Sequence, residues 1–169
     1  MNGWSRCRRP HVVAIGALLL TITQGGAAEQ PVIGIAPVLK SNAANKQFCQ
    51  IVVLQNGSMA QNVGSTRLSS LINPARAGLA DVTTSNGSYY LSMDRPTGFS
   101  IAPPGGNDDV EFSTQFTGQG KTNFGLSPGD SRVKLKTGLT SVELHLEARK
   151  LKGAFKAGQY RATVILRCE

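Results

Sequence analysis

The chain has 169 residues, with 18 Lys and Arg against 10 Asp and Glu, which gives a formal net charge of +8 at pH 7. This length corresponds to one domain, large enough to bury a hydrophobic core and to fold without a structural metal ion. The sequence contains no internal repeat and no low-complexity block, which argues against a repeat architecture or a disordered chain.

Residues 1–28 have the order of a secretory signal peptide. Three arginines before residue 10 precede an apolar run from Val12 to Ile22, and the small residues GGAA then precede Glu29. The apolar run is shorter than the roughly 20 residues that a membrane-spanning helix needs. We therefore predict cleavage after Ala28 and no transmembrane segment afterwards, with an uncleaved signal anchor as the alternative. Cleavage leaves residues 29–169 with a net charge of +5.

Residues 29–46 are predicted to form an N-terminal arm that is apolar at first and then polar. Ile33, Ile35 and Leu39 follow an alternating pattern in PVIGIAPVL, and Pro37 interrupts it. An extended segment of this kind can add a strand to the sheet of a neighbouring subunit, so the arm is a candidate donor strand. The proline argues against this interpretation, because proline cannot donate to a strand ladder.

Residues 47–169 are predicted to form one domain built from β-strands. Apolar and polar side chains alternate at every position from Ser141 to Arg149, where a helical pattern fails. The same alternation occurs in the segments DVEFSTQF, SRVKLKT and YRATVILRC, and stretches rich in Gly, Pro and Asn separate the segments. Several short strands without intervening helices predict an all-β fold, either an antiparallel β-sandwich or a barrel.

One turn makes a more specific prediction. Asn86 and Gly87 separate the strand-like segments LADVTTS and SYYLSMD. Asn-Gly is the preferred sequence for a type I′ turn, which needs positive φ at both positions. The two segments are therefore predicted to form a β-hairpin.

Two cysteines, Cys49 and Cys168, remain after the signal peptide is removed. An even number of cysteines in an exported chain indicates a disulfide bond, and two thiols allow one intramolecular pairing. Both cysteines lie on the apolar faces of predicted strands, as a buried bond between two strands requires. Two free thiols or an intermolecular disulfide are the alternatives.

No set of residues predicts catalysis. The segment GLSPG at residues 125–129 matches the nucleophile elbow, but that motif needs a backbone N–H after its serine, and Pro128 has none. His145, the one histidine after residue 28, lies on the polar face of a predicted strand. We therefore expect no catalytic residue, no metal site and no cofactor, and we do not expect an enzyme.

A basic stretch near the end of the chain is a candidate surface for an anionic partner such as a glycan. It lies in RKLKGAFKAG and comprises Arg149, Lys150, Lys152 and Lys156. The alternative is that these residues only keep a loop and a strand edge soluble. A nucleic acid partner is not expected.

The closing segment FKAGQYRATVIL carries a family resemblance. With Gly158, Tyr160, Ala162 and Val164, and with a cysteine early in the domain, the chain resembles secreted bacterial pilin-like proteins of the spore-coat-U-like and fimbrial-subunit families. This resemblance implies an immunoglobulin-like (pilin-like) antiparallel β-sandwich of roughly 7–9 strands. It also implies assembly at the cell surface, in some members with a periplasmic chaperone and an outer-membrane usher.

The chain departs from fimbrial subunits in the position of its cysteines. In those subunits we would expect a cysteine pair confined to the first half, whereas a Cys49–Cys168 bond would join the first core strand to the closing strand. This favours a self-complete domain. The expected function is nevertheless that of a non-enzymatic structural or assembly protein, secreted or periplasmic, at the cell envelope or surface. The alternative is a soluble periplasmic binding module for a glycan or an anionic partner.

Overall fold

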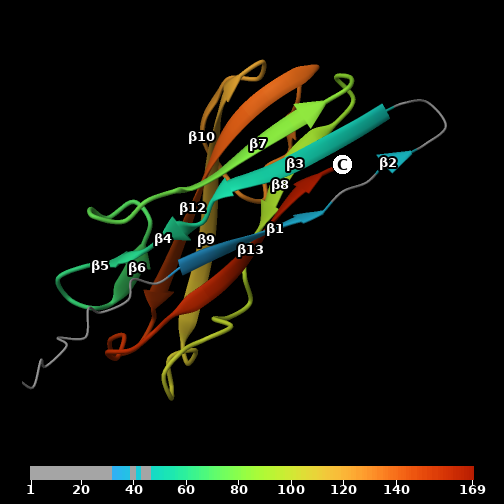
Figure 1. Cartoon of the computed structure of the whole chain (residues 1–169). Helices are drawn as coiled ribbons and strands as arrows, with labels where there is room; N and C mark the ends of the chain where they lie inside the picture. Colours follow the sequence, from blue (N-terminus) through green and yellow to red (C-terminus); the bar gives the residue numbers. More distant parts are fainter. Residues whose placement is uncertain (1–31, 39–40, 43–46) are drawn as a thin grey trace, which may run out of the picture.

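The computed structural model describes residues 32–38, 41–42 and 47–169 (Figure 1). The predicted signal peptide at residues 1–28 and part of the predicted arm at residues 29–46 lie outside this range. The described residues form thirteen strands and no helix, which confirms the all-β prediction. Among them no helix is long and apolar enough to cross a membrane.

The strands form two sheets. In the smaller sheet the order is β11-β8-β13-β1-β4, with bounds Val133–Lys134, Tyr90–Asp94, Arg161–Cys168, Val32–Val38 and Gly57–Ser58. In the larger sheet the main order is β10-β9-β12-β7-β3-β2, with bounds Phe124–Pro128, Val110–Gly120, Gly138–Lys150, Gly78–Thr84, Gln47–Gln55 and Ser41–Asn42. Two further strands belong to the larger sheet, β5 (Ala60–Gln61) and β6 (Arg67–Ser69), and β6 pairs with one end of β12.

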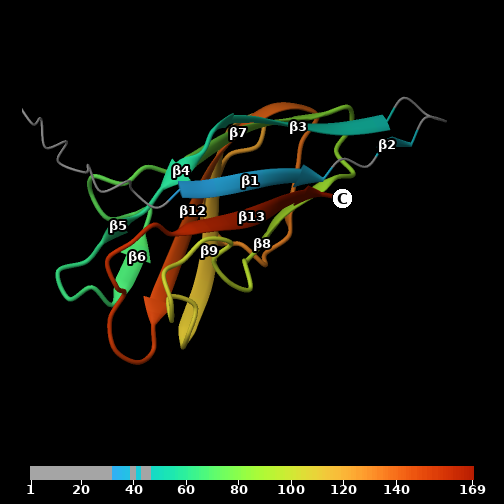
Figure 2. The same cartoon turned by 60° about the horizontal axis from the view of Figure 1, so that its bottom comes forward.

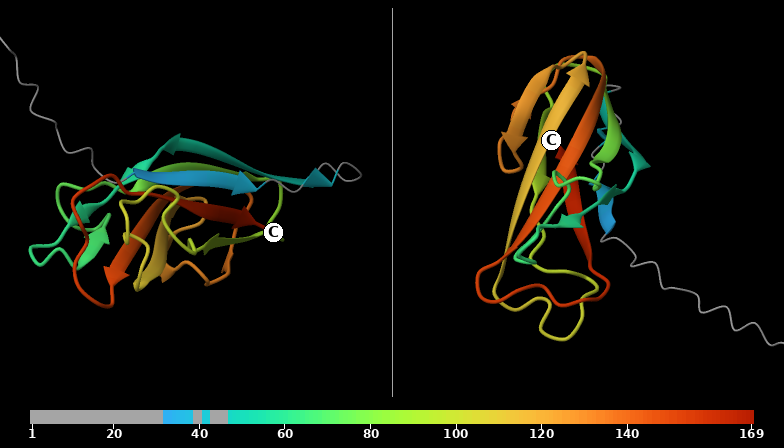
Figure 3. Two further views of the ribbon diagram at one scale, coloured as in Figure 1. Left: turned by 90° about the horizontal axis from the view of Figure 1, so that it is seen from below. Right: turned by 90° about the vertical axis from the view of Figure 1, so that its left-hand side faces the viewer.

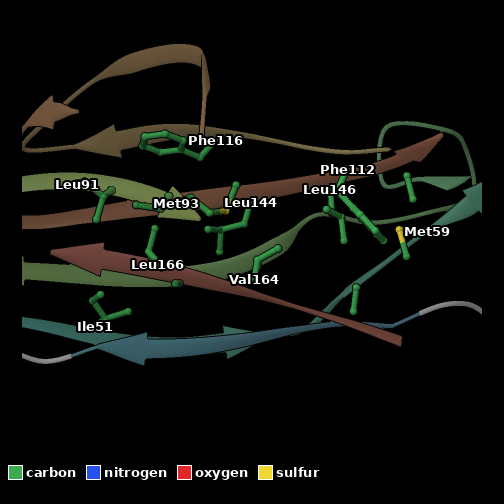
Figure 4. Packing of buried hydrophobic residues seen from close by; sticks show 14 of the residues in the cluster. Ile51, Met59, Leu91, Met93, Phe112, Phe116, Leu144, Leu146, Val164 and Leu166 are labelled. Carbon is green, nitrogen blue, oxygen red and sulfur yellow. The ribbon is translucent and has the colours of Figure 1, made fainter. Parts of the chain in front are cut away.

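Figure 3 shows the arrangement of the strands from two further sides. Buried side chains from both sheets form one core, as the alternating sequence requires. Along β12, the side chains of Val142, Leu144 and Leu146 are buried, whereas the residues between them are exposed or half-buried. Figure 4 shows Phe116 and Leu144 of the larger sheet on the same side of their strands as the core that contains Leu91, Met93 and Leu166 of the smaller sheet. Each fully buried side chain of this kind stabilises the fold by about 1.5–3 kcal/mol.

The predicted hairpin at Asn86-Gly87 is wrong. β7 pairs with β3 on one edge and with β12 on the other, so no edge of β7 remains for β8, which lies in the smaller sheet. Neither Asn86 nor Gly87 has positive φ. Instead, the Asn86 side chain accepts a hydrogen bond from the Ser88 backbone N–H at 2.9 Å and turns the chain from one sheet to the other.

Candidate functional site

Residues 32–38 of the predicted arm form the strand β1. β1 runs parallel to β13, in register from Val32 opposite Arg161 to Val38 opposite Arg167 (Figure 2). On its other edge β1 pairs with β4, at Val32 and Ile33. The first described strand therefore covers an edge of β13, the last one. This is the arrangement that the donor-strand hypothesis concerns, but here both strands belong to one chain.

The register relates the predicted arm residues to the core of the smaller sheet. Ile33 and Ile35 are the register partners of Ala162 and Val164, which are buried residues of β13. Pro37, which was expected to interrupt the strand, lies within the ladder opposite Leu166. Leu39, the third predicted residue, lies outside the described residues. Two of the three predicted positions are therefore placed on the edge of β13.

Gly34 shows how closely β1 and β13 approach one another. Its register partner is Thr163, an exposed residue of β13, and a Cβ added to Gly34 would lie 3.5 Å from Thr163 Oγ1. This is an ordinary van der Waals distance. A side chain at position 34 would therefore contact the outer face of β13. A cysteine placed there can show by cross-linking whether β1 pairs with β13 of the same chain or of another copy.

The disulfide prediction is confirmed. Cys49 of β3 is bonded to Cys168 of β13, with their Cα atoms 6.3 Å apart and both side chains buried. The bond joins the larger sheet to the smaller sheet. It also lies at the end of β13 where Val38, the last residue of β1, pairs with Arg167. β13 is thus held by the disulfide and by its pairing with β8 independently of its contact with β1.

The basic stretch is only partly available to a partner. The Lys150 ammonium group donates hydrogen bonds to the carbonyl oxygens of Gly105, at 2.9 Å, and of Asp108. The Lys156 ammonium group donates to the carbonyl oxygen of Pro104 at 3.0 Å. Both lysines therefore hold the loop that contains residues 102–109. Their ammonium groups use some of their hydrogen-bond donors on the backbone of this loop.

The other two residues of that stretch have different surroundings. Arg149 is exposed on β12, and its register partner on β9 is the acidic residue Glu111. Lys152 is exposed in the loop that follows β12. On its other side, Arg149 is the register partner of Arg67 on β6. Two of the four cations therefore bind backbone carbonyls, and a third lies in the sheet between an acidic and a basic residue.

An aromatic cluster supports this end of the molecule. The Phe99 ring meets the rings of Phe112 and Tyr160 edge to face, each with a centroid separation of 4.9 Å. The Tyr160 hydroxyl donates to the carbonyl oxygen of Lys156 at 3.0 Å, and burial raises the pKa of this tyrosine. The Asn107 side chain accepts from the Phe99 N–H at 2.7 Å and donates to the Phe99 carbonyl at 3.1 Å. These contacts pack the aromatic side chains and the adjacent loop closely at this end of the two sheets.

His145 has neighbours that the sequence pattern did not reveal. Its Nδ1 lies 3.2 Å from Ser70 Oγ, and its Nε2 lies 4.0 Å from a carboxylate oxygen of Glu143. Burial lowers the pKa of His145, and the Glu143 charge opposes that effect in part. Ser70 is buried, and its Oγ also accepts the Leu146 N–H at 3.1 Å. A buried hydroxyl with this second bond cannot easily reach a substrate, so the arrangement fits a structural contact.

Ser127, the serine of the nucleophile-elbow match, donates its hydrogen bond to a backbone carbonyl and not to a histidine. Ser127 lies in β10, and its hydroxyl donates to the carbonyl oxygen of Gly125 at 3.0 Å. This is a local turn-type hydrogen bond between residues two apart. The motif therefore matches in letters but has a different local geometry.

A shallow cleft of about 450 Å³ lies between β8 and the end of β10. Asp94 lines it, accepts a hydrogen bond from Arg167 Nε at 2.6 Å and forms an ion pair with Arg167 Nη2 at 2.6 Å, and these contacts raise the pKa of Arg167. The cleft floor includes the buried Thr114, whose carbonyl oxygen accepts the Gly129 N–H at 2.8 Å. The Asp94–Arg167 ion pair joins β8 to β13 on the edge of β13 that lies opposite β1. Nothing in the sequence pattern brings residues 94 and 167 together, because their pairing depends on the sheet order.

The described residues hold no group of three or more His, Cys, Asp and Glu side chains arranged to bind a metal ion. A scan of protein-family models and a search of curated proteins each found no match to this chain. Of the features described above, the pairing of β1 with β13 is the most specific.

Proposed function

We propose that this chain is a non-enzymatic structural or assembly protein of the bacterial cell envelope or surface, a pilin- or coat-like subunit with an immunoglobulin-like sandwich. In this proposal the chain is secreted or periplasmic, and β1 is the element through which copies associate. The observation that carries it is the parallel pairing of β1 with β13 along the whole of β1.

The pairing suits an exchangeable strand because β1 is the first described strand and pairs with the last one. The chain continues from β1 through β2 to β3, and the other edge of β1 pairs with β4 only at Val32 and Ile33. The β1 strand of another copy can make the same contacts with β13, because identical chains present identical edges.

The disulfide, which favours a self-complete domain, is also compatible with exchange of β1. When β1 leaves, β13 keeps its pairing with β8 and its covalent bond to β3. The edge that receives a strand is therefore preserved while no strand occupies it. A subunit that must wait for a neighbour needs such a pre-organised acceptor.

A soluble binding module for a glycan or an anionic partner is less well supported. Lys150 and Lys156, two of the four candidate residues, are bonded to the carbonyl oxygens of the adjacent loop. A partner would have to compete with these contacts. The assembly function is therefore the one that we carry forward.

Cysteine pairs can test whether the arm passes between copies. One chain would carry Gly34→Cys and a second, of different mass, Thr163→Cys, and the two would be folded together and oxidised mildly. Because positions 34 and 163 are in register, we expect a disulfide-linked heterodimer. A Gly34→Cys chain mixed with a Gln119→Cys chain is the matched control, since Gln119 is exposed on β9 of the other sheet.

The contrary result is equally clear. If a single chain with both Gly34→Cys and Thr163→Cys closes its own disulfide, and mixed single variants never link, β1 stays within its own domain. The assembly proposal based on this arm would then be wrong.

A further inference from the structure

Two Asn-Gly pairs lie in the described part of the chain, at residues 56–57 and 86–87, and a serine follows each of them. In such a pair the asparagine side-chain carbon, Cγ, lies within reach of the glycine backbone nitrogen, and attack by that nitrogen closes a five-membered imide ring. Glycine offers the least hindered nitrogen because it has no side chain. Since the two sites share the sequence Asn-Gly-Ser, a difference in their reactivity must come from the fold around them.

The backbone at Asn56-Gly57 is held by sheet pairing. Asn56 follows the last residue of β3, and Gly57 is the first residue of β4. Gly57 is buried and is the register partner of Ile33 in β1. The Ser58 N–H donates to the carbonyl oxygen of Arg76 at 2.9 Å, and the Ser58 hydroxyl oxygen accepts the Arg76 N–H at 3.0 Å. The peptide between residues 56 and 57 therefore cannot turn toward the Asn56 side chain without loss of these contacts.

The Asn86-Gly87 pair has different surroundings. It lies outside the strands, in the segment that crosses from β7 to β8. Gly87 is exposed, and among the hydrogen bonds of the described residues none uses the Gly87 N–H as its donor. Asn86 Oδ1 accepts the Ser88 N–H at 2.9 Å, and the Ser88 hydroxyl donates to the same oxygen. Two donors therefore meet at the oxygen that becomes negative when a nucleophile adds to Cγ, which is the arrangement of an oxyanion hole.

We propose that Asn86 is a modification site, at which the folded chain converts its own asparagine into aspartate and isoaspartate. The Gly87 nitrogen gives its proton to hydroxide and uses the freed electron pair to bond to Asn86 Cγ. The second electron pair of the Cγ–Oδ1 double bond moves onto Oδ1, where the two Ser88 donors stabilise the negative charge. When this pair returns to the double bond, the Cγ–Nδ2 bond breaks, and the nitrogen takes a proton from water and leaves as ammonia.

Water then opens the imide ring. Addition of water at Cγ gives aspartate, whereas addition at the main-chain carbonyl carbon of residue 86 gives isoaspartate, in which the main chain runs through Cγ. The two steps together consume one water molecule and release one ammonia molecule, and nothing is oxidised or reduced. Solvent is the only co-reactant, so this chemistry is independent of the proposed assembly.

The products change the connection between the two sheets. The Ser85 N–H donates to the carbonyl oxygen of Phe48 at 3.0 Å, and Tyr90 and Glu169 exchange two backbone hydrogen bonds, at 2.7 and 2.9 Å. The crossing segment is therefore held at both ends, next to the two disulfide-bonded cysteines. Aspartate at position 86 adds a negative charge but can still accept the Ser88 N–H. Isoaspartate adds a main-chain carbon between the two anchored ends, which the short segment must accommodate.

The test incubates the native, disulfide-bonded chain at mildly alkaline pH, folded and in urea, and follows both Asn-Gly peptides by mass spectrometry. An isoaspartate-specific methyltransferase, which labels only isoaspartate, identifies the second product. We expect Asn86 to lose its amide several times faster than Asn56 in the folded chain, and the two sites to react at similar rates in urea. The proposal is wrong if Asn86 keeps its amide in the folded chain while the unfolded chain reacts, or if Asn56 reacts as fast as Asn86 in the folded chain.

Three substitutions separate the role of the fold from that of the local sequence. Ser88→Ala removes one of the two donors, and we expect amide loss at Asn86 to slow about tenfold in the folded chain and to stay unchanged in urea. Ser58→Ala, at the equivalent position of the other pair, is the matched control and should leave the rate at Asn86 unchanged.

The third substitution, Gly87→Ala, hinders the attacking nitrogen and should slow the reaction both in the folded chain and in urea. The fold accommodates it, because Gly87 has no positive φ and an added Cβ would lie 3.5 Å from the Leu135 carbonyl oxygen, an ordinary van der Waals distance. If the folded Ser88→Ala chain reacts at Asn86 as fast as the native chain does, or if Ser88→Ala slows the folded and the unfolded chain alike, the site formed by the Ser88 donors is excluded.

Discussion

Cys168 of β13 is bonded to Cys49 of β3, so the last strand of the chain, which lies in the smaller sheet, is joined to a strand of the larger sheet. We expect replacement of both residues by alanine to lower the free energy of unfolding by about 2–5 kcal/mol. Alanine avoids placing an unpaired hydroxyl in the core. Urea unfolding of the variant, of the native chain and of the reduced native chain measures the effect. Equal stability of oxidised and reduced native chain would contradict it.

The core between the sheets makes a second prediction. Leu166 of β13 is fully buried, and Leu166→Ala should destabilise the fold by about 2–5 kcal/mol because it removes apolar contacts and leaves a cavity. Leu139→Ala, at an exposed position of β12, should change stability by no more than about 0.5 kcal/mol. Chemical unfolding of both variants gives the comparison. Similar losses at both positions would place the core elsewhere.

Gly129 is constrained by its neighbours. A Cβ added there would lie 2.0 Å from Thr114 Oγ1 and 2.6 Å from the Met93 carbonyl oxygen, so Gly129→Ala must displace the backbone. At Gly125 an added Cβ would meet nothing within 4 Å. We expect the first substitution to lower the melting temperature clearly and the second to leave it nearly unchanged. A stable Gly129→Ala protein would mean that β8 and the turn after β10 are less closely packed than described.

His145 should make stability depend on pH. Burial lowers its pKa in the folded state below the ordinary value of 6.5, so the unfolded chain binds a proton first as the pH falls. Stability should therefore decrease as the pH falls through 6.5 and should stop decreasing, for this group, below the folded-state pKa. His145→Asn keeps a polar group near Ser70 and should flatten the profile between about pH 7 and about pH 5. Parallel profiles for variant and native chain would show that this proton is not linked to unfolding.

The lysines that hold the 102–109 loop can be tested separately from the rest of the basic stretch. Lys150→Met removes the hydrogen bonds to Gly105 and Asp108 but keeps an apolar side chain near Phe155. We expect faster amide hydrogen exchange in that loop, with little change in the core strands. Lys152→Met, at an exposed position, is the control. If both variants exchange alike, the lysine contacts do not order the loop.

The sequence predicts the local character of the strands better than their partners. Alternation identifies the buried positions of β12 and β13 because the side chains of a strand alternate between its faces with a period of two. The same pattern places Cys49 and Cys168 on inward faces. Because the chain is predicted to be exported, two remaining cysteines then indicate a disulfide bond. These inferences need only residues that are near one another in the chain.

What the sequence did not show depends on the order of strands. The turn at Asn86 satisfies local preferences for a hairpin, but β7 already has a partner on each edge, so the chain crosses to the other sheet. The contact of Ser70 with His145 and the pair of Asp94 with Arg167 join residues 75 and 73 positions apart. Such contacts follow from topology, which alternation alone does not determine.

The pairing of β1 with β13 also sets an order of events in folding. Val32 and Arg161 are neighbours in the sheet, as are Cys49 and Cys168 through their disulfide, although each pair is separated by most of the described chain. During synthesis, the early residues must wait until residues 161–168 have emerged before they can reach their partners. A chain that is still being made therefore holds β1 without its native neighbour until residues 161–168 follow.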